Sequence, residues 1–362
     1  MDFSRLRYPF FALSVILLLV ALWAGLLRLG WQWSFLGGRS SLSHGPLMIS
    51  GFLGTLIGLE RAVALRKFWP YLAPVASGTG GLLLVIDMPG KVGMLLISLG
   101  SVVTVILFLV ALRQHRAFHT VVMSLGALSW LIGNLFWVEG WQVYRIVLWW
   151  AGFLILTVAG ERLELARLIR LSKVRKMTFF FSSVVFLGGV LLSMFAYDLG
   201  TRLAGVGMIC LSLWLLTSDI SRKTLYHSGL PRYIAVVLLI GYLWLGVAGT
   251  LGLLFGGNAA GPLYDAFLHA TFLGFVFSMI FGHAPLIFPA VFGKQAVYHQ
   301  VLFVPAGLMT ISLIMRLAGD FSGVNSWRMW GGLINGVALI FFITVMAALV
   351  MKGVKYNGLG KL

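Results

Sequence analysis

The stretch GFLGTLIGLER, residues 51–61, contains a cassette that occurs three times in the chain. It starts with a glycine and a phenylalanine and ends, nine residues after the glycine, at Glu60-Arg61. Related stretches are GFLILTVAGER at 152–162 and GFVFSMIFGH at 274–283. The glycines are separated by 101 and 122 residues, and about four membrane-spanning helices with short loops occupy that length. The repeats therefore predict a triplicated helical membrane protein.

The composition independently indicates a membrane protein. Apolar residues make up 60% of the 362 residues and charged residues 10%, which does not describe a water-soluble domain. Each span needs roughly 20 mostly apolar residues, with its backbone hydrogen bonds satisfied inside the helix. Twelve segments meet this need, near 9–29, 45–65, 69–87, 92–112, 119–138, 146–165, 178–197, 202–218, 232–256, 263–283, 299–318 and 326–350.

The fold class predicted from these segments is all-α, a polytopic bundle of twelve transmembrane helices. Short loops join the segments and leave no room for a folded domain outside the membrane. We therefore expect a single transmembrane domain over residues 1–362, with internal repeats near 1–112, 113–218 and 219–351.

The distribution of basic residues predicts the orientation. With the N-terminus inside, the cytoplasmic ends hold 20 of the 27 Lys and Arg residues, which follows the positive-inside rule. Both termini are then cytoplasmic, and the outer loops hold six of the other seven basic residues, including Arg39, Arg316 and Arg328. The net charge of +17 reflects topology and contact with anionic lipid headgroups, so the lipid bilayer is the expected partner and nucleic acid is not.

Two histidines lie at similar depths in two of the repeats. His44 precedes Gly51 by seven residues and His269 precedes Gly274 by five, a difference of about 3 Å along a helix. A neutral imidazole in an apolar bundle needs a partner for each nitrogen, and a metal together with a backbone carbonyl supplies both. We therefore predict that His44 and His269 ligate one haem iron. The single cysteine, Cys210, excludes covalent c-type attachment, so the haem is expected to be haem b.

His283 is a candidate for a second site. It follows His269 by fourteen residues and shares its helix face at the opposite end of the span. A second haem there requires another histidine, and His299 at the start of the eleventh span is a candidate. The alternative is that His283 forms a hydrogen bond within the turn before Pro285.

The motifs around these histidines resemble the haem–copper oxidase subunit I superfamily, and within it the smaller NnrS-type haem proteins. The segment HGPLMI at 44–49 is similar to the low-spin haem helix of that superfamily. The segment HATFLG at 269–274, with its later exit HAPLIFP at 283–289, is similar to the other haem helix. The resemblance implies twelve helices in a pseudo-threefold bundle, in the cytoplasmic membrane of a bacterium or archaeon. It also implies haem-propionate contacts for Arg328, and Arg39 is a further candidate for them.

The departures from the superfamily limit the expected chemistry. The spans 146–165 and 178–197, which hold copper-binding histidines in the oxidases, contain no histidine here. Phe267 stands where the tenth helix would carry the histidine of an oxygen-reducing haem. The resemblance thus implies nitric-oxide handling, sensing or electron transfer, with nitric oxide, a quinone or an electron-transfer protein as partner. If the protein is an enzyme, we expect a haem-dependent oxidoreductase, and no catalytic residue is assigned.

Two other function classes remain open. Twelve helices with internal repeats also occur in secondary transporters, although those repeats are usually two. A membrane assembly protein without a cofactor would have histidines that only form hydrogen bonds. Neither of these two classes contains haem, so detection of haem in the purified protein would distinguish them from the predicted haem protein.

Overall fold

The computed structural model describes residues 7–33, 43–65, 67–169, 171–293 and 297–353. Within these ranges every regular element is a helix, which confirms the all-α prediction. Eleven of the described helices are long and apolar enough to cross a membrane, as in a multi-pass membrane protein. The remaining predicted span, near 69–87, forms a helix of 14 residues, Leu72–Val85, after a 3₁₀ turn at Trp69–Tyr71. At about 21 Å this helix is shorter than the hydrocarbon core, so twelve full spans are not confirmed.

The chain divides into two compact units at Phe153–Leu154, within one long helix. Unit 1 comprises residues 1–153 and unit 2 residues 154–362. The helices of unit 1 are α1 (Arg7–Arg28), α2 (His44–Pro46), the π-helix η3 (Leu47–Leu53), α3 (Gly54–Leu65), η4 (Trp69–Tyr71), α4 (Leu72–Val85), α5 (Val92–Gln114), α6 (Phe118–Glu139) and the first part of α7 (Val143–Leu165).

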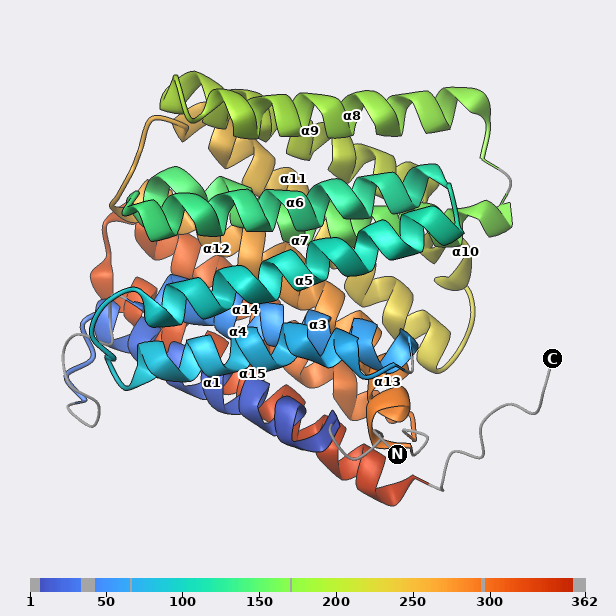
Figure 1. Ribbon diagram of the computed structural model, residues 1–362, viewed down its shortest axis with the longest axis horizontal. Coiled ribbons are helices and arrows are strands. Elements are labelled where there is room, and N and C mark those ends of the chain that lie inside the picture. Colours follow the sequence, from blue (N-terminus) through green and yellow to red (C-terminus); the bar gives the residue numbers. More distant parts are fainter. Residues whose placement is uncertain (1–6, 34–42, 66, 170, 294–296, 354–362) are drawn as a thin grey trace. The chain divides into compact units, whose positions relative to one another are not determined.

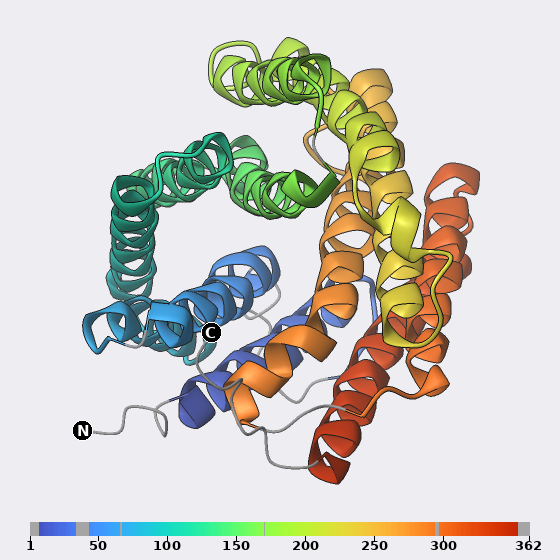
Figure 2. The same ribbon diagram turned by 90° about the vertical axis from the view of Figure 1, so that its right-hand side faces the viewer.

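Unit 2 contains the end of α7, η5 (Ala166–Ile169), α8 (Lys173–Leu192), α9 (Tyr197–Ser218), α10 (Ser221–Thr224), α11 (Leu230–Phe255), α12 (Pro262–His269), the π-helix η6 (Ala270–Val276), α13 (Phe277–Phe292), η7 (Gln300–Leu302), α14 (Phe303–Ser322) and α15 (Asn325–Lys352). Within unit 1, α4, α5 and α6 pack in series (Figure 1). Within unit 2, α8, α9 and α11 pack in series, and α14 pairs with α15 (Figure 2).

Glycines allow several of these helices to approach closely. A Cβ on Gly205 of α9 would lie 2.6 Å from the Gly249 carbonyl oxygen of α11, and one on Gly80 of α4 would lie 2.7 Å from the Gly93 carbonyl oxygen of α5. Real Cβ atoms do not approach so closely, so these positions require glycine. Helices in lipid associate through such small-residue contacts, because apolar burial alone provides little driving force there.

The two predicted histidine-bearing spans each contain a seven-residue π-helix. Gly51 is the fifth residue of η3 and Gly274 the fifth residue of η6, so the cassette occupies the same place in both. The middle cassette, with Gly152, lies in the regular α-helix α7. π-Helical segments are uncommon and frequently occur at functional sites, so their position next to the two candidate histidines is informative. The pseudo-threefold arrangement of the repeats remains a prediction.

Candidate functional site

His44 begins α2 and packs against α1 within unit 1. Its Nδ1 lies 2.7 Å from the Ala21 carbonyl oxygen. A carbonyl oxygen only accepts, so Nδ1 carries the proton and a neutral ring then has its lone pair at Nε2. One turn further along α1, a Cβ on Gly25 would lie 2.7 Å from His44 Cε1. The absence of a side chain at Gly25 therefore makes room for the imidazole.

His269 ends α12 in unit 2 and has the same Nδ1 arrangement. Its Nδ1 lies 2.8 Å from the Asp265 carbonyl oxygen, one turn earlier on the same helix. The same nitrogen lies 3.4 Å from Asp265 Oδ1. In its neutral form the ring again carries its proton at Nδ1 and its lone pair at Nε2, which is the form that ligates a metal.

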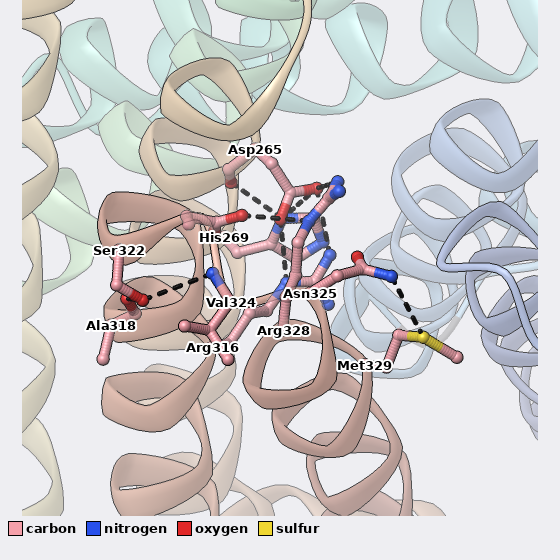
Figure 3. Close-up of polar contacts among 10 residues, drawn as sticks. Asp265, His269, Arg316, Ala318, Ser322, Val324, Asn325, Arg328 and Met329 are labelled. Atoms are coloured by element: carbon pink, nitrogen blue, oxygen red, sulfur yellow. Dashed lines mark hydrogen bonds and ion pairs between the residues drawn. The ribbon is translucent and has the colours of Figure 1, made fainter.

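Asp265 is the centre of a group of buried and half-buried charges in unit 2 (Figure 3). Arg316 of α14 binds its carboxylate through two hydrogen bonds, Nε to Oδ2 at 2.9 Å and Nη2 to Oδ1 at 3.0 Å. Arg328 of α15 lies 3.6 Å from Asp265 Oδ1 and 2.9 Å from Asp320 Oδ1. The Arg328–Asp320 approach is an ion pair and not a hydrogen bond, since neither atom has an aligned hydrogen-bond partner among the described residues. We call Asp265, Arg316, Asp320 and Arg328 the Asp265 cluster.

Glycines also position the two arginines of this cluster. A Cβ on Gly319 of α14 would lie 2.5 Å from the Arg328 backbone nitrogen, and one on Gly331 of α15 would lie 2.7 Å from that of Arg316. Each arginine therefore lies opposite a glycine on the other helix. The close pairing of α14 and α15 brings both guanidinium groups towards α12.

The two residues proposed for a second site differ from each other. His283 on α13 is half-buried, and its Nδ1 lies 2.7 Å from the Met279 carbonyl oxygen, so it repeats the arrangement of the other two. His299 is exposed and its Nδ1 accepts a hydrogen bond from the Val301 N–H at 3.1 Å. His299 thus caps a short helix. This arrangement gives no support to its pairing with His283 in a second haem site, which stays a prediction.

A second buried charge pair involves the arginine of the middle cassette. Arg162 binds Asp219 through two hydrogen bonds of 2.8 Å, and its Nη2 also donates to Ser221 Oγ at 3.2 Å. Asp219 is thus the ion-pair partner of Arg162. Arg162 and Asp219 are 4% and 2% exposed, so each depends on the other for compensation of its charge.

Asp219→Asn is expected to destabilise the fold by about 3–5 kcal/mol, because it leaves a buried arginine without a counter-charge. Thermal unfolding of the purified protein in detergent measures the loss. Asp198→Asn is the matched control, since Asp198 pairs with Arg202 on the exposed face of α9. Breaking that pair should cost about 0–1 kcal/mol. Equal effects of the two substitutions would contradict the buried-pair argument.

The structure brings together part of the predicted site. His269 and Arg328 both approach Asp265, and His283 lies further along the same span. His44 belongs to unit 1, and Arg39 lies outside the described residues. Arg316 and Arg328 were predicted to lie in outer loops, and this prediction was wrong, because they lie within helices α14 and α15. Asp265 and Asp320 were not predicted, although the i, i+4 spacing of Asp265 and His269 was a usable signal.

No group of three or more His, Cys, Asp or Glu side chains that could hold a metal ion occurs among the described residues. A haem requires no such group, because its porphyrin supplies four of the six ligands and the protein supplies one or two.

Comparison with known proteins identifies the family. The family model described as "Domain of unknown function (DUF8744)" matches residues 7–351. The chain belongs to this family. No curated protein matches the chain.

Proposed function

We propose that this DUF8744 protein is an integral membrane haem protein that binds one haem b, with His44 and His269 as axial ligands. One observation carries the proposal. Both histidines have Nδ1 at a backbone carbonyl, 2.7 Å from Ala21 and 2.8 Å from Asp265, and both precede a π-helix with the cassette glycine at its fifth position.

The chemistry of these residues fits the proposed group. A histidine that ligates a metal commonly donates its other ring nitrogen to a carbonyl or carboxylate, which fixes the tautomer and the ring orientation. His44 and His269 both meet that requirement. That the two act on one iron rests on the sequence repeat and on the resemblance to the haem–copper oxidase superfamily.

The proposed role is electron transfer, or the handling or sensing of nitric oxide. A bound haem would carry one electron at a time and, if one histidine dissociated, would bind nitric oxide. The resemblance to NnrS-type proteins favours nitric oxide. The protein's residues would contribute ligation, orientation and charge, and any enzymatic activity would be that of a haem-dependent oxidoreductase.

The proposed location is the cytoplasmic membrane of a bacterium or archaeon, with both termini on the cytoplasmic side. The positive-inside distribution of 20 of 27 basic residues supports this orientation. A reporter that is active only in the periplasm, fused after Leu362, should be inactive, and activity would contradict the proposed orientation.

A secondary transporter is the second candidate function, and two ion pairs favour it. Asp265 with Arg316, and Arg162 with Asp219, lie in or next to helices that are apolar enough to span a membrane. Ionisable residues in such helices often mark a substrate or proton pathway. A transporter of this kind would contain no haem.

The absorption spectrum of the purified protein tests the proposal directly. We expect a Soret band, and a pyridine haemochrome assay that gives about one haem b per chain. Protein expressed with sufficient haem precursor that nevertheless remains colourless would overturn the haem proposal and favour the transporter.

A further inference from the structure

Asp265 offers two oxygens to the same nitrogen of His269. The two residues stand four apart on α12, so their side chains lie on the same helix face. The Asp265 carbonyl oxygen lies 2.8 Å from His269 Nδ1, and its carboxylate Oδ1 lies 3.4 Å away. The imidazole is thus held against a residue that carries a full negative charge.

The charge on Asp265 is compensated from the other side. Arg316 makes two hydrogen bonds of 2.9 and 3.0 Å to the carboxylate, and Arg328 lies 3.6 Å away (Figure 3). A carboxylate in an apolar bundle is costly without such partners, and the fork of Arg316 also fixes its plane. The carboxylate therefore has a fixed position behind His269.

The hydrogen-bond partner of His44 is of a different kind. Its Nδ1 meets the neutral carbonyl of Ala21, which belongs to another helix, α1. A carboxylate raises the basicity of an imidazole ligand more than a carbonyl does, and a more basic ligand stabilises the oxidised iron. The two proposed ligands are therefore unequal.

We propose that Asp265 is a positioning residue that fixes the ring of His269 and lowers the reduction potential of the proposed haem through that ring. Arg316 and Arg328 supply the counter-charges that make this arrangement stable. The inference rests on the proposed function, and goes beyond it by assigning a role to a residue that ligates nothing itself.

The test compares reduction potentials of the purified haem protein by spectroelectrochemical titration. Asp265→Asn removes the charge but keeps the side-chain shape, and it should raise the potential. Asp265→Asn also leaves the positive charge of Arg316 without its partner. The electric field of that charge would by itself raise the potential. The double variant Asp265→Asn/Arg316→Gln removes both charges and leaves the net charge unchanged. If Asp265 acts through His269, the double variant should still have a raised potential.

Electron paramagnetic resonance of the oxidised protein gives a second measurement. Its g-values report the axial ligand field and should shift in the double variant. Asp198→Asn is the control, because it breaks an exposed Asp–Arg pair on α9, and it should leave both measurements unchanged. Wild-type potential and g-values in the double variant would overturn the inference, even if Asp265→Asn alone shifts the potential. Wild-type protein without haem would instead overturn the proposed function.

Discussion

Alanine at His44 or at His269 is expected to abolish the low-spin haem spectrum, because each substitution deletes one of the two proposed axial ligands. The haem content should fall from about one per chain towards zero, or the remaining haem should become five-coordinate and high-spin. Absorption spectra and pyridine haemochrome assays of the purified variants measure both outcomes. Both histidines precede a π-segment and each is a proposed ligand, so neither variant should keep the low-spin spectrum.

His227→Ala is the matched control for these variants. His227 is exposed and follows the short helix α10, away from either π-segment in sequence. Its removal should leave the haem content and the spectrum unchanged. Full low-spin haem in both the His44 and the His269 variant would refute the ligand assignment and move it to His283 and His299.

The helices could be predicted from the sequence because apolar runs of membrane length have few alternatives in lipid. The predicted span 45–65 corresponds to helices over 44–65, and the predicted span 92–112 to a helix over 92–114. The segment near 69–87 was the exception. Its helix begins only after Trp69–Tyr71, and it ends at Val85. Hydropathy does not distinguish a short helix from a full span when the flanking residues are also apolar.

The charged interior of unit 2 could not be predicted in the same way. Arg316 and Arg328 were expected in loops, yet both lie in helices, where an arginine is costly without a partner. Their partners come from other parts of the chain: Asp265 lies 51 residues before Arg316. Pairing over such separations depends on tertiary packing, here on the contact of α14 with α12 and α15. The π-segments were also not predicted. The cassette is apolar in all three repeats, but only two of them are π-helical, so the apolar pattern does not distinguish a π-helix from an α-helix.

Gly25→Ala is expected to weaken haem binding although it alters no proposed ligand. The new Cβ would lie 2.7 Å from His44 Cε1 and 2.8 Å from Nδ1, closer than real Cβ atoms approach. The ring is held one turn away by the Ala21 carbonyl, so it cannot move without loss of that hydrogen bond. Perturbation of the groups that orient a metal ligand typically costs about 10–100-fold in metal affinity. Haem retention during competition with apomyoglobin measures the change.

Gly336→Ala provides the comparison for this variant. Gly336 lies in α15, and a Cβ there would meet nothing within 4 Å, so the substitution should leave haem retention unchanged. Both variants replace glycine by alanine inside a helix, a change that favours the helix by about 1 kcal/mol, so the difference between them isolates the contact with His44. If the Gly25→Ala variant retains haem as the wild type does, iron ligation by His44 does not depend on the packing of its ring against α1. The Nδ1 contact with Ala21 would then have no part in ligation, and the observation that carries the proposed function would be lost for His44.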